Sequence, residues 1–234
     1  RASGTSRPSL MVSTPTTTEI IAEVRSQLIG PGGAFEVIAE PVGGIGQPGP
    51  IDMLVYANRL AHLREVFAFA AAHGDATFIV YGERRITFSQ FVADANRVAA
   101  NLATLGVGHG DRVAVLSQNN PEWCLTFWAT VSSGGVLVGL NGWWKADEIL
   151  YGLQDSGATV LVADAKRFER IADRLDKAPD LAHVYLVGGG PDDFPAAAGA
   201  GAKVQRFEDL GAEPTPDFPD AEIAGYVDGR LVPA

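Results

Sequence analysis

A strict alternation of strand-like and helix-like segments between Ile86 and Asp164 is the feature of this sequence that most restricts its fold. Short apolar runs alternate with longer segments in which apolar residues recur every three or four positions. Strands separated by helices are joined by right-handed crossovers and lie parallel in one sheet. Parallel strands covered on both faces appear as continuous apolar runs. The sequence therefore predicts an α/β fold with a parallel sheet flanked by helices.

Four segments have the composition of buried strands, and a helical segment follows each of the first three. The strands are expected at residues 112–117, 136–140, 159–163 and 182–187. The helices between them are expected at residues 121–129, 147–154 and 166–175. Asn120 is a good N-cap, and Pro121 suits the first helical position, so the Asn119–Asn120 pair is interpreted as a helix start.

A helix, a β-hairpin and a second helix are expected before the first of these strands. The first helix and the two hairpin strands are expected at residues 60–74, 77–81 and 85–88. Thr87 and Gln90 have the spacing of a capping box, which predicts that the second helix begins there. Gly106 is expected to end it.

The two ends of the chain lack this regular pattern. The expected organisation is an irregular arm, an α/β domain and a loop with an acidic, Pro-rich linker, at residues 1–59, 60–187 and 188–234. A short amphipathic helix is expected at residues 18–28, and one helical turn at residues 207–210. Residues 1–10 are small and polar, and they are either native or added to a chain that starts at Met11.

Composition excludes several classes of protein. With 28 acidic and 18 basic residues the net charge is −10, so the backbone of a nucleic acid would be repelled. The single cysteine, Cys124, excludes an internal disulfide, and its apolar neighbours favour a small buried side chain over a reactive thiol. The four histidines lack the spacing of metal ligands, and no apolar run is long enough to cross a bilayer. Without the apolar core of a secretory signal, the cytoplasm is the expected compartment.

The segment Ile86–Asp164 resembles the adenylate-forming enzymes, the superfamily of acyl-CoA synthetases, luciferases and peptide-synthetase adenylation domains. The resemblance lies in TFSQFVADANRVAANLATLGVGHGDRVAVLSQNNPEW, in GGVLVGLNGWW and in DEILYGLQDSGATVLV. It covers roughly residues 60–187, and it is greatest to bacterial fatty acyl-CoA synthetases. The resemblance implies the N-terminal subdomain of such an enzyme.

The resemblance also implies a two-step reaction that uses ATP, Mg²⁺ and CoA. A fatty acid carboxylate attacks the α-phosphate of ATP, which gives an acyl-adenylate and pyrophosphate, and the CoA thiol then displaces AMP. The family supplies a Ser/Thr/Gly-rich loop that ends in Lys, and this sequence does not contain one. Glycines 188–190 follow a strand, but the acidic PDDFP segment comes next, where a pyrophosphate would need a helix N-terminus.

We therefore expect no catalytic, cofactor-binding or metal-binding residue in this chain, and no adenylation by it alone. The remaining synthetase domains are expected partners. Residues 225–234 do not look like the family. A designed cut, a natural truncation and a change of reading frame are all open as explanations of why the sequence departs from the family there.

Six residues are candidates for the acyl pocket of the complete enzyme. They are Trp123, Phe127, Trp128, Asn141, Trp143 and Trp144. The first three crowd the helix after Asn120, and in acyl-CoA synthetases a neighbouring helix helps to wall the acyl tunnel. The alternative is that they pack this helix onto the sheet. The last three follow a strand at its carboxyl end, the edge at which open α/β sheets bind ligands.

Two other functions are open on the sequence alone. The chain is either part of a synthetase, a non-catalytic interaction module derived from one, or a free-standing nucleotide-binding domain. Homodimerisation through the N-terminal region and peripheral association of the complete enzyme with membranes are expected by analogy with the family.

Overall fold

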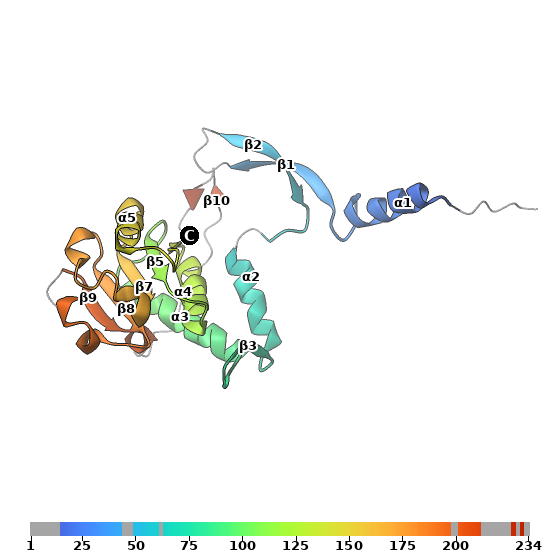
Figure 1. The fold of residues 1–234 in the computed structure, drawn as a ribbon. Helices are drawn as coiled ribbons and strands as arrows, with labels where there is room; N and C mark the ends of the chain where they lie inside the picture. Colours follow the sequence, from blue (N-terminus) through green and yellow to red (C-terminus); the bar gives the residue numbers. More distant parts are fainter. Residues whose placement is uncertain are drawn as a thin grey trace, which may run out of the picture. The chain divides into compact units, whose positions relative to one another are not determined.

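The computed structural model describes residues 15–43, 49–60, 63–197, 201–211, 226–227 and 230–231 (Figure 1). These residues belong to two units. The first unit contains helix α1, the hairpin of strands β1 and β2, and the two short strands β10 (Tyr226–Val227) and β11 (Arg230–Leu231). The second unit contains every element from α2 to η5.

The first unit begins with α1 (Thr17–Ile29), which confirms the helix expected at residues 18–28. Its N-terminus is a capping box: the Thr16 side chain accepts a hydrogen bond from the backbone N–H of Glu19, and the Glu19 carboxylate accepts one from the backbone N–H of Thr16. No residue of α1 is buried.

An antiparallel hairpin follows α1, and the sequence analysis did not expect it. Strand β1 (Val37–Gly43) pairs with β2 (Pro50–Tyr56) in a register that sets Val37 opposite Tyr56. The many Gly and Pro residues argued against regular structure here. Pro41 is nevertheless accommodated opposite Asp52, because a strand with a free edge tolerates a residue without an N–H donor.

The second unit begins with the predicted helix, hairpin and helix. They are α2 (Leu63–Ala70), η1 (Ala71–His73), β3 (Thr77–Tyr81), β4 (Arg84–Thr87) and α3 (Phe88–Thr104). The capping box of Thr87 and Gln90 is present at the start of α3. Gly106 ends the helical region with a φ of 84°, a conformation that glycine adopts without strain.

A five-stranded parallel sheet forms the core of the second unit, in the order β6-β5-β7-β8-β9. Its strands are β5 (Arg112–Leu116), β6 (Val136–Gly139), β7 (Val160–Asp164), β8 (His183–Val187) and β9 (Lys203–Arg206). The connecting elements are α4 (Pro121–Ser132), α5 (Ala146–Ser156), α6 (Ala165–Phe168), η2 (Leu175–Lys177), η3 (Pro191–Asp193) and η4 (Pro195–Ala197), and η5 (Phe207–Gly211) follows the last strand. The predicted parallel, helix-flanked sheet is confirmed.

Two apolar layers cover the faces of this sheet. Along β5, Val113 and Val115 join the layer that contains residues of α3 and α4, whereas Ala114 and Leu116 join the layer that contains residues of α5 and α6. All four side chains are fully buried. Alternate residues of a strand point to opposite faces, so an apolar run is required wherever helices cover both.

Three details of the sheet correct the sequence analysis. Strand β6, expected to be buried, lies at one edge of the sheet, and Val136 is 49% exposed. Strand β9 lies at the other edge, inside a segment that was interpreted as loop and linker. The helix expected at residues 166–175 is only α6, after which turns continue the chain to η2.

Candidate functional site

The carboxyl edge of the parallel sheet has the topology of a ligand site. From β5 the chain crosses to β6 on one side, and from β6 it returns to β7 on the other side of β5. Strands β5 and β7 therefore flank a topological switch point, and the crevice beyond their carboxyl ends is the usual place for a ligand in an open α/β sheet. The residues that follow these strands decide what this crevice can hold.

Asp164, the last residue of β7, bridges the switch point. Its side-chain oxygens accept hydrogen bonds from the backbone N–H of Gln118 at 2.8 Å, from the backbone N–H of Arg167 at 2.9 Å and from Nη1 of Arg167 at 2.6 Å. Asp164 is 8% exposed, so these bonds offset the cost of burying its charge. The switch point thus carries a carboxylate with its own cation, an arrangement that does not attract a phosphate group.

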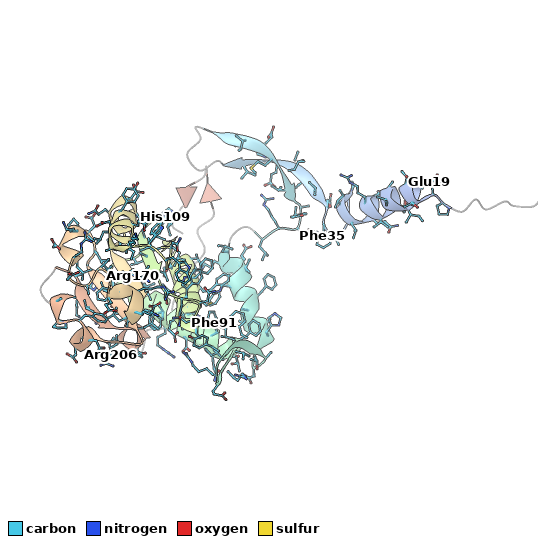
Figure 2. All side chains as sticks on the ribbon, in the orientation of Figure 1. Glu19, Phe35, Phe91, His109, Arg170 and Arg206 are labelled. Carbon is cyan, nitrogen blue, oxygen red and sulfur yellow. The ribbon has the colours of Figure 1, made fainter. Side chains whose placement is uncertain are left out.

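Asn141, Trp143 and Trp144 lie on a turn that follows edge strand β6. The Asn141 side-chain oxygen accepts the backbone N–H of Trp143 at 2.9 Å, and the Asn141 carbonyl oxygen accepts the backbone N–H of Trp144 at 3.0 Å. Arg170, labelled in Figure 2, donates from Nη1 to the carbonyl oxygens of Gly142 at 2.9 Å and of Trp144 at 2.7 Å. Asn141 therefore orders this turn, and Arg170 fixes it from the α6 region.

The two tryptophans of this turn have different surroundings. Trp143 is 87% exposed, so almost the whole indole ring is free to contact another molecule. Trp144 is partly buried and packs against the apolar layer that contains α5. A methyl group at Gly152 of α5 would lie 3.0 Å from the Trp144 ring, which shows how closely the two approach. Trp144 has a packing role, and Trp143 presents a surface.

Removing the Arg170 side chain is expected to loosen this turn. Arg170→Ala deprives two carbonyl oxygens of their donor, so we expect a loss of about 1–3 kcal/mol in the free energy of unfolding, measured by urea titration. Arg174→Ala is the matched control, because Arg174 pairs at 2.6 Å with Asp147, whose side chain is 85% exposed. The control is expected to cost less than about 1 kcal/mol. Equal losses in the two variants would contradict the role of Arg170.

Helix α4 carries the other three candidates, and its sequence fixes where it begins. The Asn120 side chain accepts the backbone N–H of Trp123 at 2.8 Å, as predicted for the N-cap. The Trp123 and Phe127 rings stack at 5.9 Å, and Phe127 meets Trp128 edge-on at 5.1 Å. Trp128 stacks on Phe67 of α2 at 5.2 Å.

These aromatic side chains are only partly buried, whereas Leu125, Thr126, Ala129 and Thr130 of α4 are buried. Leu125 and Ala129 are buried in the layer that also holds Val113 and Val115 of the sheet. Trp123 and Trp128 pack against that layer without being enclosed by it. The geometry thus brings the three aromatics of α4 together, and separately orders Asn141 and Trp143 in one turn.

Trp128 is the only one of the six candidates that lines a cavity in the described part of the second unit. The other walls come from α2, η1, β3 and α3. The sequence analysis did not identify these residues as a site. The apolar face of the helix at residues 60–74 was the available signal, and it was used only to predict a helix.

Cys124 is partly buried, which agrees in part with its interpretation as a small core residue. Burial raises the pKa of its thiol, and the charge of Glu122 raises the pKa further. Because the thiolate is the nucleophile, this environment disfavours reactivity at neutral pH. Among the residues that the structure describes, no group of three or more potential ligands is placed to hold a metal ion. No helix in the described ranges is long and apolar enough to span a membrane.

A model of the family described as "AMP-binding enzyme" matches residues 66–224. The chain belongs to the AMP-binding enzyme family. The match includes the whole parallel sheet, the switch point and α4. The family resemblance inferred from the sequence is thereby confirmed.

Relatives within the AMP-binding enzyme family include curated CoA ligases. A medium/long-chain-fatty-acid–CoA ligase of Mycobacterium tuberculosis is 31% identical over 180 residues, which make up 73% of this chain and 30% of the relative. A 3-hydroxybenzoate–CoA/4-hydroxybenzoate–CoA ligase of Thauera aromatica is 34% identical over 128 residues, 53% of this chain and 23% of the relative. The chain thus spans less than a third of the length of these relatives.

Solved structures show the same fold. An anthranilate CoA ligase in complex with anthranoyl-AMP superposes with a TM-score of 0.56 and 28% identity, over 63% of this chain and 27% of that chain. Coronafacic acid ligase from Pectobacterium brasiliense gives a TM-score of 0.59 at 21% identity, over 66% of this chain and 30% of that chain. The parallel sheet and its helices are therefore the fold of one portion of an AMP-binding enzyme.

Proposed function

We propose that this chain is the N-terminal α/β portion of an AMP-forming fatty acid–CoA ligase. The complete enzyme would convert a fatty acid, ATP and CoA to acyl-CoA, AMP and pyrophosphate. The observation that carries the proposal is the family match over residues 66–224, together with relatives that are named fatty-acid–CoA ligases. The substrate is the part of the proposal that rests on the relatives' names, since other relatives act on hydroxybenzoates.

Within this proposal, ATP, Mg²⁺ and CoA bind mainly to residues outside this chain. The sequence contains no Ser/Thr/Gly-rich loop ending in Lys, and Asp164 with Arg167 already occupies the switch point. A phosphate in this crevice would meet the Asp164 carboxylate, so the proposal of a free-standing nucleotide-binding domain is disfavoured. The chain alone is then a scaffold and is inactive.

The six candidate residues take different parts in this proposal. Trp143 and Phe127 are the candidates for contact with the acyl group, since neither belongs to the two buried layers of the sheet. Trp123 and Trp128 support α4, and Trp144 and Asn141 support the turn after β6. A homodimer and peripheral membrane association of the complete enzyme stay predictions.

The edges of the sheet favour association with further polypeptide. Strands β6 and β9 each pair with one neighbour among the described residues, and Val136 of β6 is 49% exposed. An unpaired edge with an exposed apolar side chain is a place where another segment can add. This feature fits a larger synthetase, and it also fits a non-catalytic module that binds a partner chain.

A chimeric enzyme distinguishes these functions. We would replace the matching N-terminal portion of the Mycobacterium tuberculosis relative by residues 63–211 of this chain and measure acyl-CoA formation from fatty acids of several lengths. A synthetase portion is expected to restore ATP-dependent acyl-CoA formation, whereas the 234-residue chain alone should show only background pyrophosphate exchange. A folded chimera without activity on any fatty acid would contradict the proposal and favour the interaction module.

Two variants of the chimera test whether the turn that carries Trp143 contributes to the acyl pocket. The Arg170→Ala form of the chimera should retain its fold but lose activity if the Trp143 turn contributes to the acyl pocket. Arg174→Ala, which breaks only an exposed ion pair, should leave activity unchanged.

Calorimetry of the 234-residue chain with ATP, AMP and CoA should give no binding, and measurable nucleotide affinity would support the free-standing domain.

A further inference from the structure

A cavity of about 300 Å³ lies among α2, η1, β3, α3 and α4, and none of its walls comes from the carboxyl edge of the sheet. Seven of its lining residues carry rings: His73, Phe67, Phe69, Phe78, Phe88, Phe91 and Trp128. Phe91, labelled in Figure 2, is 1% exposed and belongs to α3. The cavity is a property of the second unit alone.

Six of these rings, all except Phe69, form a continuous series of contacts around the cavity. Trp128 stacks on Phe67, and Phe67 meets Phe91 edge-on, with centroid distances of 5.2 and 6.4 Å. Phe91 meets Phe78 at 4.8 Å, and Phe78 contacts Phe88 at 4.5 Å. The series ends where Phe88 contacts His73 at 4.7 Å. Each ring is held by at least one other, so the walls are already formed before any ligand binds.

The remaining lining residues show that the cavity is open on one side. Val66 is 42% exposed and Phe69 is 62% exposed, while Ala70 contributes only a methyl group. His73 is exposed, and its imidazole and the indole N–H of Trp128 are the hydrogen-bonding groups of the lining. The site therefore offers an apolar, aromatic interior with two hydrogen-bonding side chains, of which His73 is the exposed one.

Size restricts the occupant. An apolar cavity of about 150 Å³ binds benzene, so a volume twice as large suits a molecule with two fused rings. A charged ligand would lose its hydration without finding a partner charge among these walls. Aromatic faces and edges are favourable partners for another planar ring.

We propose that this cavity binds a small uncharged aromatic molecule of one or two fused rings, with its one polar group hydrogen-bonded to the His73 imidazole. This site shares Trp128 with the six candidates for the acyl pocket, but it uses no residue of the switch point and no nucleotide. If the cavity binds no such molecule, the proposed ligase function is unaffected. If the chimera is inactive, the proposed binding site is likewise unaffected.

The test uses 2-naphthol as the probe and the 234-residue chain. Isothermal titration calorimetry is expected to show one site, with a dissociation constant on the order of 0.1 mM for a ligand of this size. Ala70→Phe fills the cavity and is expected to weaken binding at least tenfold. Ala72→Phe is the matched control, because Ala72 is exposed and does not line the cavity, and it should bind like the parent chain.

Two further measurements make the result independent of that variant. In the parent chain, nuclear Overhauser effects should connect naphthol protons with the ring protons of Phe78 and Phe91. His73→Phe should weaken 2-naphthol binding about fivefold, the loss expected for one hydrogen bond, and should leave naphthalene binding unchanged.

The proposal is wrong if 2-naphthol shows no saturable binding, or if Ala70→Phe and Ala72→Phe bind it equally well. A second copy of the chain is the competing occupant of the cavity. In that case sedimentation would show a dimer that Ala70→Phe dissociates and that 2-naphthol does not affect, which would also overturn the proposal.

Discussion

Replacing Asp164 by Ala is expected to lower the free energy of unfolding by about 3–5 kcal/mol, because it removes one partner of a buried ion pair and leaves the other uncompensated. The Asp164 carboxylate accepts two backbone N–H groups and the Arg167 guanidinium. The side chains of Arg167 and Asp164 are only 16% and 11% exposed. Water therefore cannot fully replace the lost partner. Urea titration followed by circular dichroism measures the change.

An exposed pair with the same spacing provides the control. Asp94 and Arg97 are also three residues apart, here both within α3, and lie 2.9 Å apart, but their side chains are 42% and 41% exposed. Asp94→Ala should cost less than about 1 kcal/mol. Asp164→Asn keeps an acceptor for a backbone N–H, so its loss in the free energy of unfolding should lie between those of Asp164→Ala and Asp94→Ala. If Asp164→Ala lowered the free energy of unfolding as little as Asp94→Ala, the contacts of Asp164 at the switch point would not be those described here.

The second large effect is expected at Phe168, at the end of α6. Phe168 is fully buried, and its ring meets Phe194 edge-on at 5.1 Å. Phe168→Ala removes this contact and leaves a cavity in the layer that contains α5 and α6, so we expect a loss of about 3–5 kcal/mol. Thermal and urea unfolding of the full chain measure it.

Phe69→Ala is the matched control for Phe168→Ala. Phe69 is 62% exposed on α2, so the same substitution there removes little buried area and should cost less than about 1 kcal/mol. Phe194→Ala should reproduce part of the Phe168 loss, since the two rings share one contact. A Phe168→Ala variant as stable as Phe69→Ala would show that residues 188–197 do not pack on α6.

Most of the second unit was predictable from local sequence. The strands β5, β7 and β8 have apolar runs, and α3 and α4 have side-chain caps at Thr87 and Asn120. These signals need only neighbouring residues: a strand buried on both faces must be apolar throughout, and a helix start must satisfy its free N–H groups. The family was recognisable for the same reason.

Elements that depend on distant partners were not predictable in this way. Strand β9 has the sequence KVQR, without an apolar run, and its backbone pairs with the free edge of β8. The hairpin of β1 and β2 contains proline, and its register depends on cross-strand contacts. The apolar spacing after Lys166 predicted a longer helix, but Arg170 donates to carbonyl groups of the turn after β6 while the chain continues in turns.

Local sequence was enough to predict the class of fold, the family and the buried strands β5, β7 and β8, because burial on two faces and helix capping act through residues close in the chain. What the carboxyl edge presents, and where the six candidate residues lie, depends on the tertiary structure. Asp164 closes the switch point by accepting an N–H from the loop after β5, Arg170 fixes the turn that exposes Trp143, and Trp128 meets Phe67 from a separate helix. Each of these contacts joins segments far apart in sequence, and no local pattern specifies which distant group will satisfy a given donor or cover a given ring.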